Sequence, residues 1–417
     1  MRVSHFDNTG LTSDVLEQTQ KRLDSYRNSI AEALRANDST AAEYSLAHAR
    51  TPQLHDTLAR VAKRYGKTKH LVLIGIGGSN LGTEAVHSVL TTGAVKLSSL
   101  DTISAAALAS VREDLRPYKK ASDITVCVVS KSGNTAETLV NAGVVLEQLK
   151  KQFGQHIYQQ TIFIGDPDTE FMKMGAQLGA DCIAMPKVVG GRYSVATEVG
   201  LVPLTILKHD TDSYIEGFLD AHTAEYESVT ADNASRVFHY IENGYRHYNF
   251  FAFDPRLATL GAWYRQLFAE SLGKNTDLSG QATEKGMLPT ISTPVELHSV
   301  GQLYLSGFPG VYTDFVSFDD DHIDFAIPKQ SLSQAYGRFS MQEVATALYG
   351  GVIKAYQEKQ LSYRATVFDE NLAYSLGLFM GMRMREVMYI AKLLNLNAFD
   401  QPNVELYKNK TRAILGL

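Results

Sequence analysis

The sequence is poor in cysteine and lacks any long hydrophobic run. It has two cysteines in 417 residues. Cys127 and Cys182 both lie in apolar stretches, so we expect them to be small buried residues in a reducing compartment. No uninterrupted apolar stretch reaches the length that crosses a membrane, and residues 1–7 contain no apolar segment typical of a secretion signal. These absences predict a cytoplasmic protein without a membrane partner.

Positive charge is also scarce. The 40 lysines and arginines are outnumbered by 45 acidic residues, which gives a formal charge of -5 at pH 7. Since no block of basic residues is present to form a nucleic-acid surface, we exclude DNA and RNA as partners. The composition, 44% hydrophobic and 20% charged, is ordinary for a globular protein, and the length is sufficient for two domains with substantial cores.

A glycine-rich turn follows an apolar run within residues 70–82, and an amphipathic run begins directly behind it. Glycines let the backbone approach an anion, and the start of a helix supplies unpaired N–H groups. The dinucleotide-binding motif would need glycine in place of Asn80, and the Walker motif would need lysine in place of Thr83. The hydroxyl of Ser79 among the glycines favours a small sugar phosphate, so we expect neither NAD nor ATP as a ligand.

A second phosphate-binding turn is predicted at residues 130–135, between a buried strand at 124–129 and a helix at 136–151. Three hydroxyls and one ammonium group meet in this turn: Ser130, Lys131, Ser132 and Thr135. Taken alone, the segment fits an ordinary strand-to-helix turn with capping hydroxyls equally well. Because the carboxyl ends of parallel strands lie along one edge of a sheet, the two turns can face the same ligand.

Strands and helices alternate in two blocks. Helices are expected at residues 11–36 and 41–64, followed by strands near 70–76, 124–129, 161–165 and 182–185. After helices at 212–244, the second block has strand candidates at 249–253, 290–292, 311–318 and 365–368. The methionines of a long helix at 370–394 indicate core packing rather than a metal or cofactor site.

At six places, in the same order along the chain, the sequence resembles the glucose-6-phosphate isomerase family. The matching segments are the two phosphate turns at 75–82 and 130–138, a GGR-aromatic-Ser motif at 189–195, an E-S-x-G-K motif at 269–274, and residues 297–302 and 399–408. The resemblance implies an α/β fold of two sugar-isomerase (SIS) domains, each a parallel sheet covered by helices. The expected divisions are a helical segment at 1–50, SIS domains at 51–210 and 211–398, and a C-terminal active-site helix at 399–417.

Isomerisation of a sugar phosphate needs a phosphate anchor, an acid/base that opens the ring, a base that moves a proton between C1 and C2, and positive charge beside the enediolate. Glu270 ends an apolar helical stretch, and a carboxylate partly shielded from water there has a raised pKa and works as a general base. Arg192 keeps its charge and is the natural stabiliser of the enediolate.

The resemblance implies the remaining roles. His298, oriented by Glu137, opens the sugar ring, and Lys408 shares this step. In the family this histidine comes from the neighbouring subunit, so a homodimer is implied. The residues implied to bind the phosphate and the sugar are Gly78, Ser79, Ser130, Lys131, Ser132, Thr135, Gly191 and Gln401.

We therefore expect an enzyme that interconverts glucose 6-phosphate and fructose 6-phosphate through a cis-enediol, as in glycolysis and gluconeogenesis, without a cofactor. One alternative is an isomerase that also accepts mannose 6-phosphate. Another is a non-catalytic sugar-phosphate sensor on the SIS fold, which would have no need of Glu270, Arg192 and His298.

The run at residues 319–324 has four aspartates and a histidine, which resembles a set of metal ligands. It lacks the glycine and the alternate ligand spacing of a loop metal site, so we interpret it as a solvated acidic loop and expect no required metal.

Overall fold

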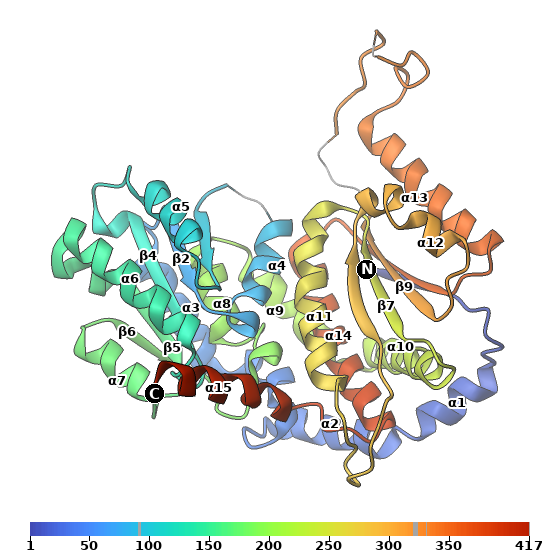
Figure 1. Cartoon of the computed structure of the whole chain (residues 1–417), viewed down its shortest axis with the longest axis horizontal. Helices are drawn as coiled ribbons and strands as arrows, with labels where there is room; N and C mark the ends of the chain where they lie inside the picture. The colour runs from blue at the N-terminus through green and yellow to red at the C-terminus, as the bar shows by residue number, and fades with distance from the viewer. Residues whose placement is uncertain (91–92, 320–323, 331, 417) are drawn as a thin grey trace.

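The structure, a computed structural model, describes residues 1–90, 93–319, 324–330 and 332–416. Its helices and strands form two blocks that stand side by side, each around one five-stranded sheet (Figure 1). The expected α/β fold class is confirmed. Within the described ranges, no helix combines the length and the apolar character needed to cross a membrane.

The first sheet is entirely parallel. Its strands, in spatial order, are β3 (Lys96–Leu100), β2 (His70–Ile74), β4 (Ile124–Val129), β5 (Thr161–Gly165) and β6 (Asp181–Ala184). The strands β2, β4 and β5 are buried along their whole length because helices cover both faces. One face packs on α3 (Pro52–Tyr65), α4 (Leu81–Val89) and α8 (Glu198–Ile206), and the other on α5 (Ala105–Leu115), α6 (Ala136–Phe153) and α7 (Glu170–Gln177).

The second sheet is parallel except at one edge. Its strands, in spatial order, are β1 (Arg2–Phe6), β10 (Tyr363–Phe368), β9 (Val311–Phe318), β7 (His247–Ala252) and β8 (Leu288–Ser292). Among these five strands, only β1 pairs antiparallel with its neighbour. One face packs on α10 (Ala224–Glu242), α11 (Ala258–Leu272) and α14 (Leu372–Leu393), and the other on α12 (Gly301–Leu305) and α13 (Met341–Glu358).

The expectation that residues 1–50 are helical is wrong for residues 2–6, which form β1. Most of the remaining residues of this segment are helical, in α1 (Ser13–Lys21), α2 (Asp24–Ala36) and two 3₁₀ helices, η1 (Ala42–Leu46) and η2 (His48–Arg50). Since Arg2 pairs with Val367, the partner of this edge strand lies at the opposite end of the chain, and the start of the chain belongs to the second sheet.

A single hydrophobic core runs from the first block into the second. The helix α9 (Thr211–Asp220) crosses α14 at two glycines. A Cβ at Gly217 would lie 2.0 Å from the carbonyl oxygen of Tyr374, and one at Gly377 would lie 1.9 Å from that of Tyr214. Only glycine permits the two helices to cross so closely. The crossing holds α14 against α9, the helix that follows the first block in the chain.

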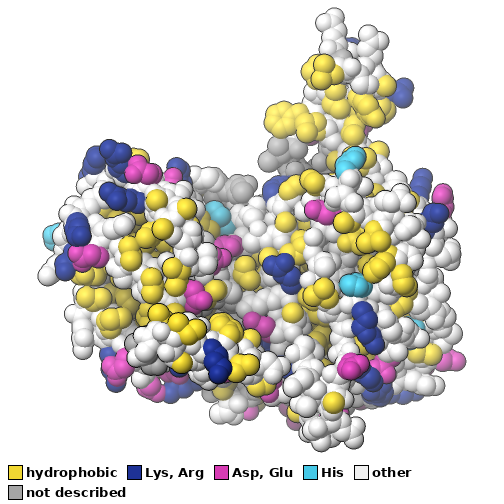
Figure 2. Space-filling view, viewed as in Figure 1, with side chains coloured by type: hydrophobic (Ala, Val, Ile, Leu, Met, Phe, Trp, Pro, Cys, Tyr) yellow, Lys and Arg dark blue, Asp and Glu magenta, His cyan; other side chains and the backbone are white. Residues whose placement is uncertain are grey.

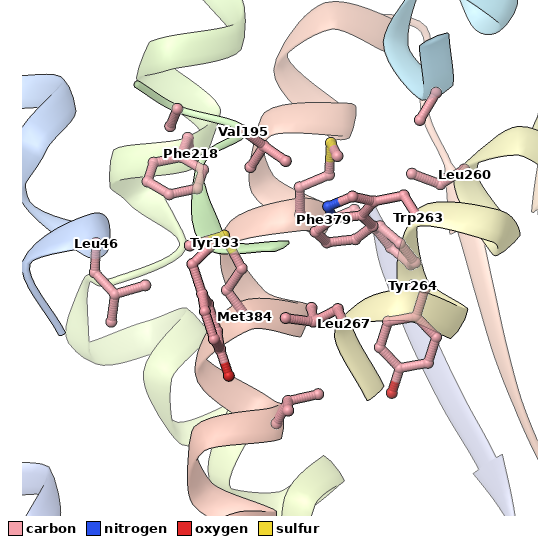
Figure 3. Close-up of a cluster of buried hydrophobic side chains, with 14 of the residues drawn as sticks. Leu46, Tyr193, Val195, Phe218, Leu260, Trp263, Tyr264, Leu267, Phe379 and Met384 are labelled. Atoms are coloured by element: carbon pink, nitrogen blue, oxygen red, sulfur yellow. The ribbon is translucent and has the colours of Figure 1, made fainter. Parts of the chain in front are cut away.

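The shared core also fixes α11. Figure 3 shows Trp263 and Leu267 of α11 in the same cluster as Phe379 and Met384 of α14, all of them buried. The methionines of α14 are all buried, as predicted from the sequence, and Met380, Met384 and Met388 pack in this core. Because Glu270 lies on the last turn of α11, the core sets its position relative to the first sheet.

The chain ends in α15 (Glu405–Leu415), a helix without any buried residue. The remaining 3₁₀ helices are η3 (Gly77–Ser79), η4 (Ala121–Asp123), η5 (Gly154–Gln160), η6 (Gly191–Tyr193), η7 (Pro255–Leu257), η8 (Pro294–His298) and η9 (Pro402–Val404).

Candidate active site

Two glycine turns contact each other beyond the end of β2. Gly77 has a φ of +62°, in the left-handed region that favours glycine. A Cβ at Gly78 would lie 2.1 Å from the carbonyl carbon of Gly191, so only glycine lets these backbones approach. The hydroxyl of Ser194 lies 2.6 Å from the carbonyl oxygen of Gly191 and 3.3 Å from that of Gly78. The first turn and the GGR motif therefore form one continuous backbone surface.

The second predicted phosphate turn is joined to this surface by Lys131. Its Nζ donates to the carbonyl oxygen of Val189, at 2.9 Å, and burial lowers the pKa of this lysine. Within the turn, Ser130 Oγ accepts from the Gly133 amide, at 3.1 Å, and lies 3.3 Å from Thr135 Oγ1. The ammonium group of Lys131, which we expect to bind the phosphate, is thus partly desolvated. Its hydrogen-bond partner is a neutral carbonyl oxygen, and a phosphate oxygen could take the place of that acceptor.

Arg192 occupies the centre of the site and is 2% exposed. Its guanidinium makes five hydrogen bonds. Nε donates to Ser271 Oγ at 2.9 Å, Nη1 donates to Gln401 Oε1 and, at 3.3 Å, to Glu270 Oε2. Nη2 donates to the carbonyl oxygens of Ala398, at 2.6 Å, and Asp400, at 3.0 Å. The cation is therefore fixed in one orientation beside the carboxylate of Glu270.

Glu270 is held on both sides. Its Oε2 accepts from Arg192, and its Oε1 accepts from Gln266 Nε2 at 3.1 Å. The side chain is still 32% exposed, so a ligand can reach it. The structure thus brings together three predicted site residues from distant segments of the chain: Arg192, Glu270 and Gln401.

Gln266 is a site residue that no sequence motif indicated. Its Nε2 would lie 2.7 Å from a Cβ at Gly77, so this amide contacts the first phosphate turn as well as Glu270. Its Oε1 is buried and has no hydrogen-bond partner among the described residues. The sequence does contain a signal for Gln266: it lies four residues before Glu270, and residues four apart lie on the same face of a helix.

Three predicted residues lie apart from this cluster within the single chain. The side chain of His298, exposed at the end of η8, makes no hydrogen bond or ion pair with any described residue. Glu137 lies in the first turn of α6. Lys408, on α15, pairs with Glu405 at 2.7 Å. The expected contact of His298 with Glu137 is therefore not made within one copy of the chain.

The two described ends of the acidic run, Asp319 and Asp324, make their contacts outside this cluster. Residues 320–323 lie outside the described residues. At its two ends, Asp319 pairs with Arg2 at 2.7 Å, and Asp324 Oδ1 accepts from the backbone amide of Gln342 at 2.9 Å. Among the residues that the structure describes, no three His, Cys, Asp or Glu side chains are placed to share a metal ion.

Known proteins resemble this chain over most of its length. Residues 38–319 match the family model of phosphoglucose isomerase. The chain belongs to this family. It is 31% identical to a glucose-6-phosphate isomerase of Thermus thermophilus over 383 residues, which cover 88% of this chain and 89% of that protein. It is 30% identical to the glucose-6-phosphate isomerase of Carboxydothermus hydrogenoformans over 372 residues, which cover 84% and 79% of the two proteins.

Solved structures share the fold over the whole chain. A hypothetical protein of Thermus thermophilus superposes with a TM-score of 0.85 at 26% identity, covering 99% of this chain and 100% of that one. A glucose-6-phosphate isomerase of Chlamydia trachomatis superposes with a TM-score of 0.80 at 18% identity, covering 99% and 88%. The family predicted from the six sequence motifs is confirmed.

Proposed function

We propose that this member of the phosphoglucose isomerase family interconverts glucose 6-phosphate and fructose 6-phosphate. The contact of Glu270 with Arg192 carries the proposal, because it places a base and a fixed cation side by side. The two turns that suit a phosphate are linked to Arg192 through Gly191 and Val189. Relatives named glucose-6-phosphate isomerase, which match this chain over most of its length, support the same activity.

In the reaction we propose, the turn at residues 130–135 and the backbone around Gly78 bind the phosphate. After ring opening, Glu270 takes the proton from C2, and the electron pair of that C–H bond forms the C1=C2 double bond of an enediolate. Arg192 stabilises the negative charge on oxygen because its guanidinium is already oriented. Glu270 then returns the proton to C1, while the proton of the C2 hydroxyl moves to O1, which gives the ketose.

The direct test is an assay of the purified protein with fructose 6-phosphate, with a chelator present and no added nucleotide. We expect formation of glucose 6-phosphate. If none forms, the proposed activity is wrong. A parallel assay for mannose 6-phosphate decides whether the enzyme also tolerates the other configuration at C2, which depends on how closely the substrate is held around Glu270.

The double substitution Ser130→Ala and Ser132→Ala is expected to weaken substrate binding much more than turnover. Each hydroxyl that donates to a charged phosphate contributes roughly 1.5–3 kcal/mol. Inhibition by 6-phosphogluconate measures the loss, and Ser29→Ala, on the exposed surface of α2, is a matched control. An unchanged inhibition constant in the double variant would show that these hydroxyls do not bind the phosphate.

We also propose a homodimer in which His298 completes the site of the partner. Exposed large apolar side chains support this assignment: they lie on η8, which ends at His298, and on α12, α13 and the segments beside these helices. They are Val295, Leu303, Phe308, Phe325, Met341 and Leu348. Figure 2 shows apolar side chains on the projection above the second block, where residues 324–330 and 332–340 precede α13. Exposed apolar patches of this kind mark interaction surfaces.

Substitution His298→Gln is expected to reduce turnover of the cyclic substrate far more than turnover of an analogue supplied in open-chain form. The reason is that His298 acts in ring opening and Glu270 in the later proton transfer. Coupled assays with the two substrates measure the ratio. Equal losses on both would assign His298 to another step or to support of the fold.

Mixing two inactive variants tests the exchange of residues between subunits. If His298 acts across the interface, a dimer of one His298→Gln chain and one Glu270→Gln chain contains one complete site. Random exchange should then restore about a quarter of the wild-type activity, because half of the dimers are mixed and each has one working site. No recovery, once exchange is verified, would place His298 and Glu270 of one site in the same subunit.

A further inference from the structure

One buried ammonium group beside the site has no role in the proposed reaction. Lys274 follows α11, and its side chain is 7% exposed. Its Nζ donates to the carbonyl oxygen of Glu270 at 2.8 Å and to that of Asp400, and it lies 3.0 Å from Asp400 Oδ1. Lys274 therefore connects the end of the helix that carries Glu270 to the turn at residues 398–401.

The same turn binds Arg192. The carbonyl oxygen of Asp400 accepts from both Lys274 and Arg192, so it lies between two cations. The next residue, Gln401, also accepts from Arg192. The second carboxylate oxygen of Asp400 accepts from Asn397 Nδ2 at 3.0 Å, which keeps the carboxylate turned toward the lysine. The orientation of the guanidinium thus depends on the position of this turn.

We propose that Lys274 is a positioning residue that fixes the turn at 398–401 against α11 and thereby orients Arg192 and Gln401 toward Glu270. The inference rests on the proposed isomerase function, and it assigns no direct contact with substrate to Lys274. A lysine suits this position because its three N–H donors can satisfy two carbonyls and one carboxylate at once. Without the cation, the carbonyl of Asp400 and the adjacent carboxylate would lose their common partner.

The charges around Lys274 fit this role. The groups that face it are Arg192, Glu270 and Asp400. Burial lowers the pKa of Lys274 from its usual value, and the Asp400 carboxylate acts in the opposite direction. The desolvation cost is offset by fixed partners, which is the arrangement expected of a lysine that orders a turn rather than one that transfers protons.

The test compares Lys274→Met with Lys285→Met. Lys285 is the matched control because it pairs with Glu242 at 2.8 Å on the surface of the same block. We expect Lys274→Met to lower kcat by about 10-fold to 10²-fold, the loss that follows a displacement of about 1 Å at a reacting group. The KM should change less than kcat, because the partners of Lys274 among the described residues are Glu270 and Asp400 and not the phosphate turn at 130–135. The control should match the wild-type enzyme in both constants.

Amide hydrogen exchange distinguishes this role from simple capping of α11. In Lys274→Met, exchange at residues 398–401 should accelerate, while exchange in the body of α11 should stay as in the wild type. A variant with wild-type kcat, or with unchanged exchange in the turn, would overturn the proposal. If Lys274→Met does not fold, Asp400→Asn provides the same test, because it removes the ion pair and keeps the shape of the side chain.

A double variant tests whether the two residues act together. Asp400→Asn should change kcat in the same direction as Lys274→Met, and the combination should be hardly worse than Lys274→Met alone, because both act through one turn. Fully additive losses would overturn the assignment. Failure of the proposed function is recognised separately, since the wild-type protein would then lack isomerase activity while the exchange measurements could still be made.

Discussion

Replacing Glu270 with glutamine is expected to remove most isomerase activity while substrate still binds. Glutamine keeps the size of the side chain but cannot accept the C2 proton. Turnover should therefore fall by at least the roughly 10²–10⁴-fold that general base catalysis supplies. The decisive measurement combines calorimetric binding of a hydroxamate mimic of the enediolate with exchange of the substrate C2 hydrogen in deuterated water.

The site can accommodate this substitution without a change in the backbone. The oxygen of a glutamine at position 270 can still accept from Arg192, at the place where Glu270 Oε2 accepts at 3.3 Å. Its amide group would then face Gln266, whose Oε1 is buried without a described partner and can accept after rotation of the amide plane. We therefore expect the circular dichroism spectrum and the thermal midpoint of the variant to stay close to those of the wild type.

Glu358→Gln is the matched control, because Glu358 is an exposed glutamate at the end of a long helix, α13. It should leave isomerisation, hydrogen exchange and binding unchanged. Wild-type exchange of the C2 hydrogen in Glu270→Gln would assign the base to another residue. Loss of binding of the mimic together with loss of turnover would show that Glu270 holds the substrate rather than moving its proton.

The central strands could be predicted because each is a continuous apolar run that ends at a turn. The stretches at 124–129 and 161–165 are bounded in the structure as they were in the prediction. The strand β3 was missed because its sequence, KLSSL, is mostly polar and lies at the edge of its sheet. The strand β1 was missed for a similar reason, and its pairing with β10 leaves no local signal.

The site, too, could be predicted only in part: its motif residues could be identified from the sequence, but their contacts could not. Motifs identified Arg192, Glu270 and Gln401 as site residues, but their contacts depend on the shared core that brings α11 and the turn at 398–401 to the GGR motif. Local spacing could have indicated Gln266, which has no motif of its own here. Lys274 belongs to the E-S-x-G-K motif, yet its partner, Asp400, lies at the far end of the chain sequence.

We expect the second large effect on stability, from a substitution in a cluster of buried charged residues in the second block. Arg364 of β10 is fully buried and binds two carboxylates. Its Nε and Nη2 donate to Asp314, at 3.0 and 2.8 Å, and its Nη1 donates to both oxygens of Glu386, each at 3.0 Å. Arg383 donates to the same two carboxylates, at 2.7 and 2.8 Å. The two guanidinium groups balance the two carboxylates, so the loss of any one of the four leaves a net buried charge.

Arg364→Met is expected to lower the free energy of unfolding by about 3–5 kcal/mol, because it leaves two buried carboxylates with a single cation. This is a large share of the roughly 5–15 kcal/mol that stabilises a typical protein. Urea denaturation at pH 7 measures the loss as a shift of the midpoint. Lys21→Met is the control, since the exposed pair of Lys21 with Glu17 should have no measurable effect. A shift in Arg364→Met no larger than in this control would contradict the prediction.

The loss should also depend on pH. Burial raises the pKa of Glu386 to about 7, and the guanidinium of Arg364 opposes this rise. Without Arg364 the folded-state pKa is higher still. When folding raises the pKa of a carboxyl group, the protein loses stability as the pH increases from the pKa of that group in the unfolded state to its pKa in the folded state. The difference between wild type and Arg364→Met should therefore be larger at pH 8 than at pH 6, where Glu386 is largely protonated in both. A second substitution, Glu386→Gln, should recover more of the loss at pH 8 than at pH 6, because it removes one of the two carboxylates that share Arg383 in the variant.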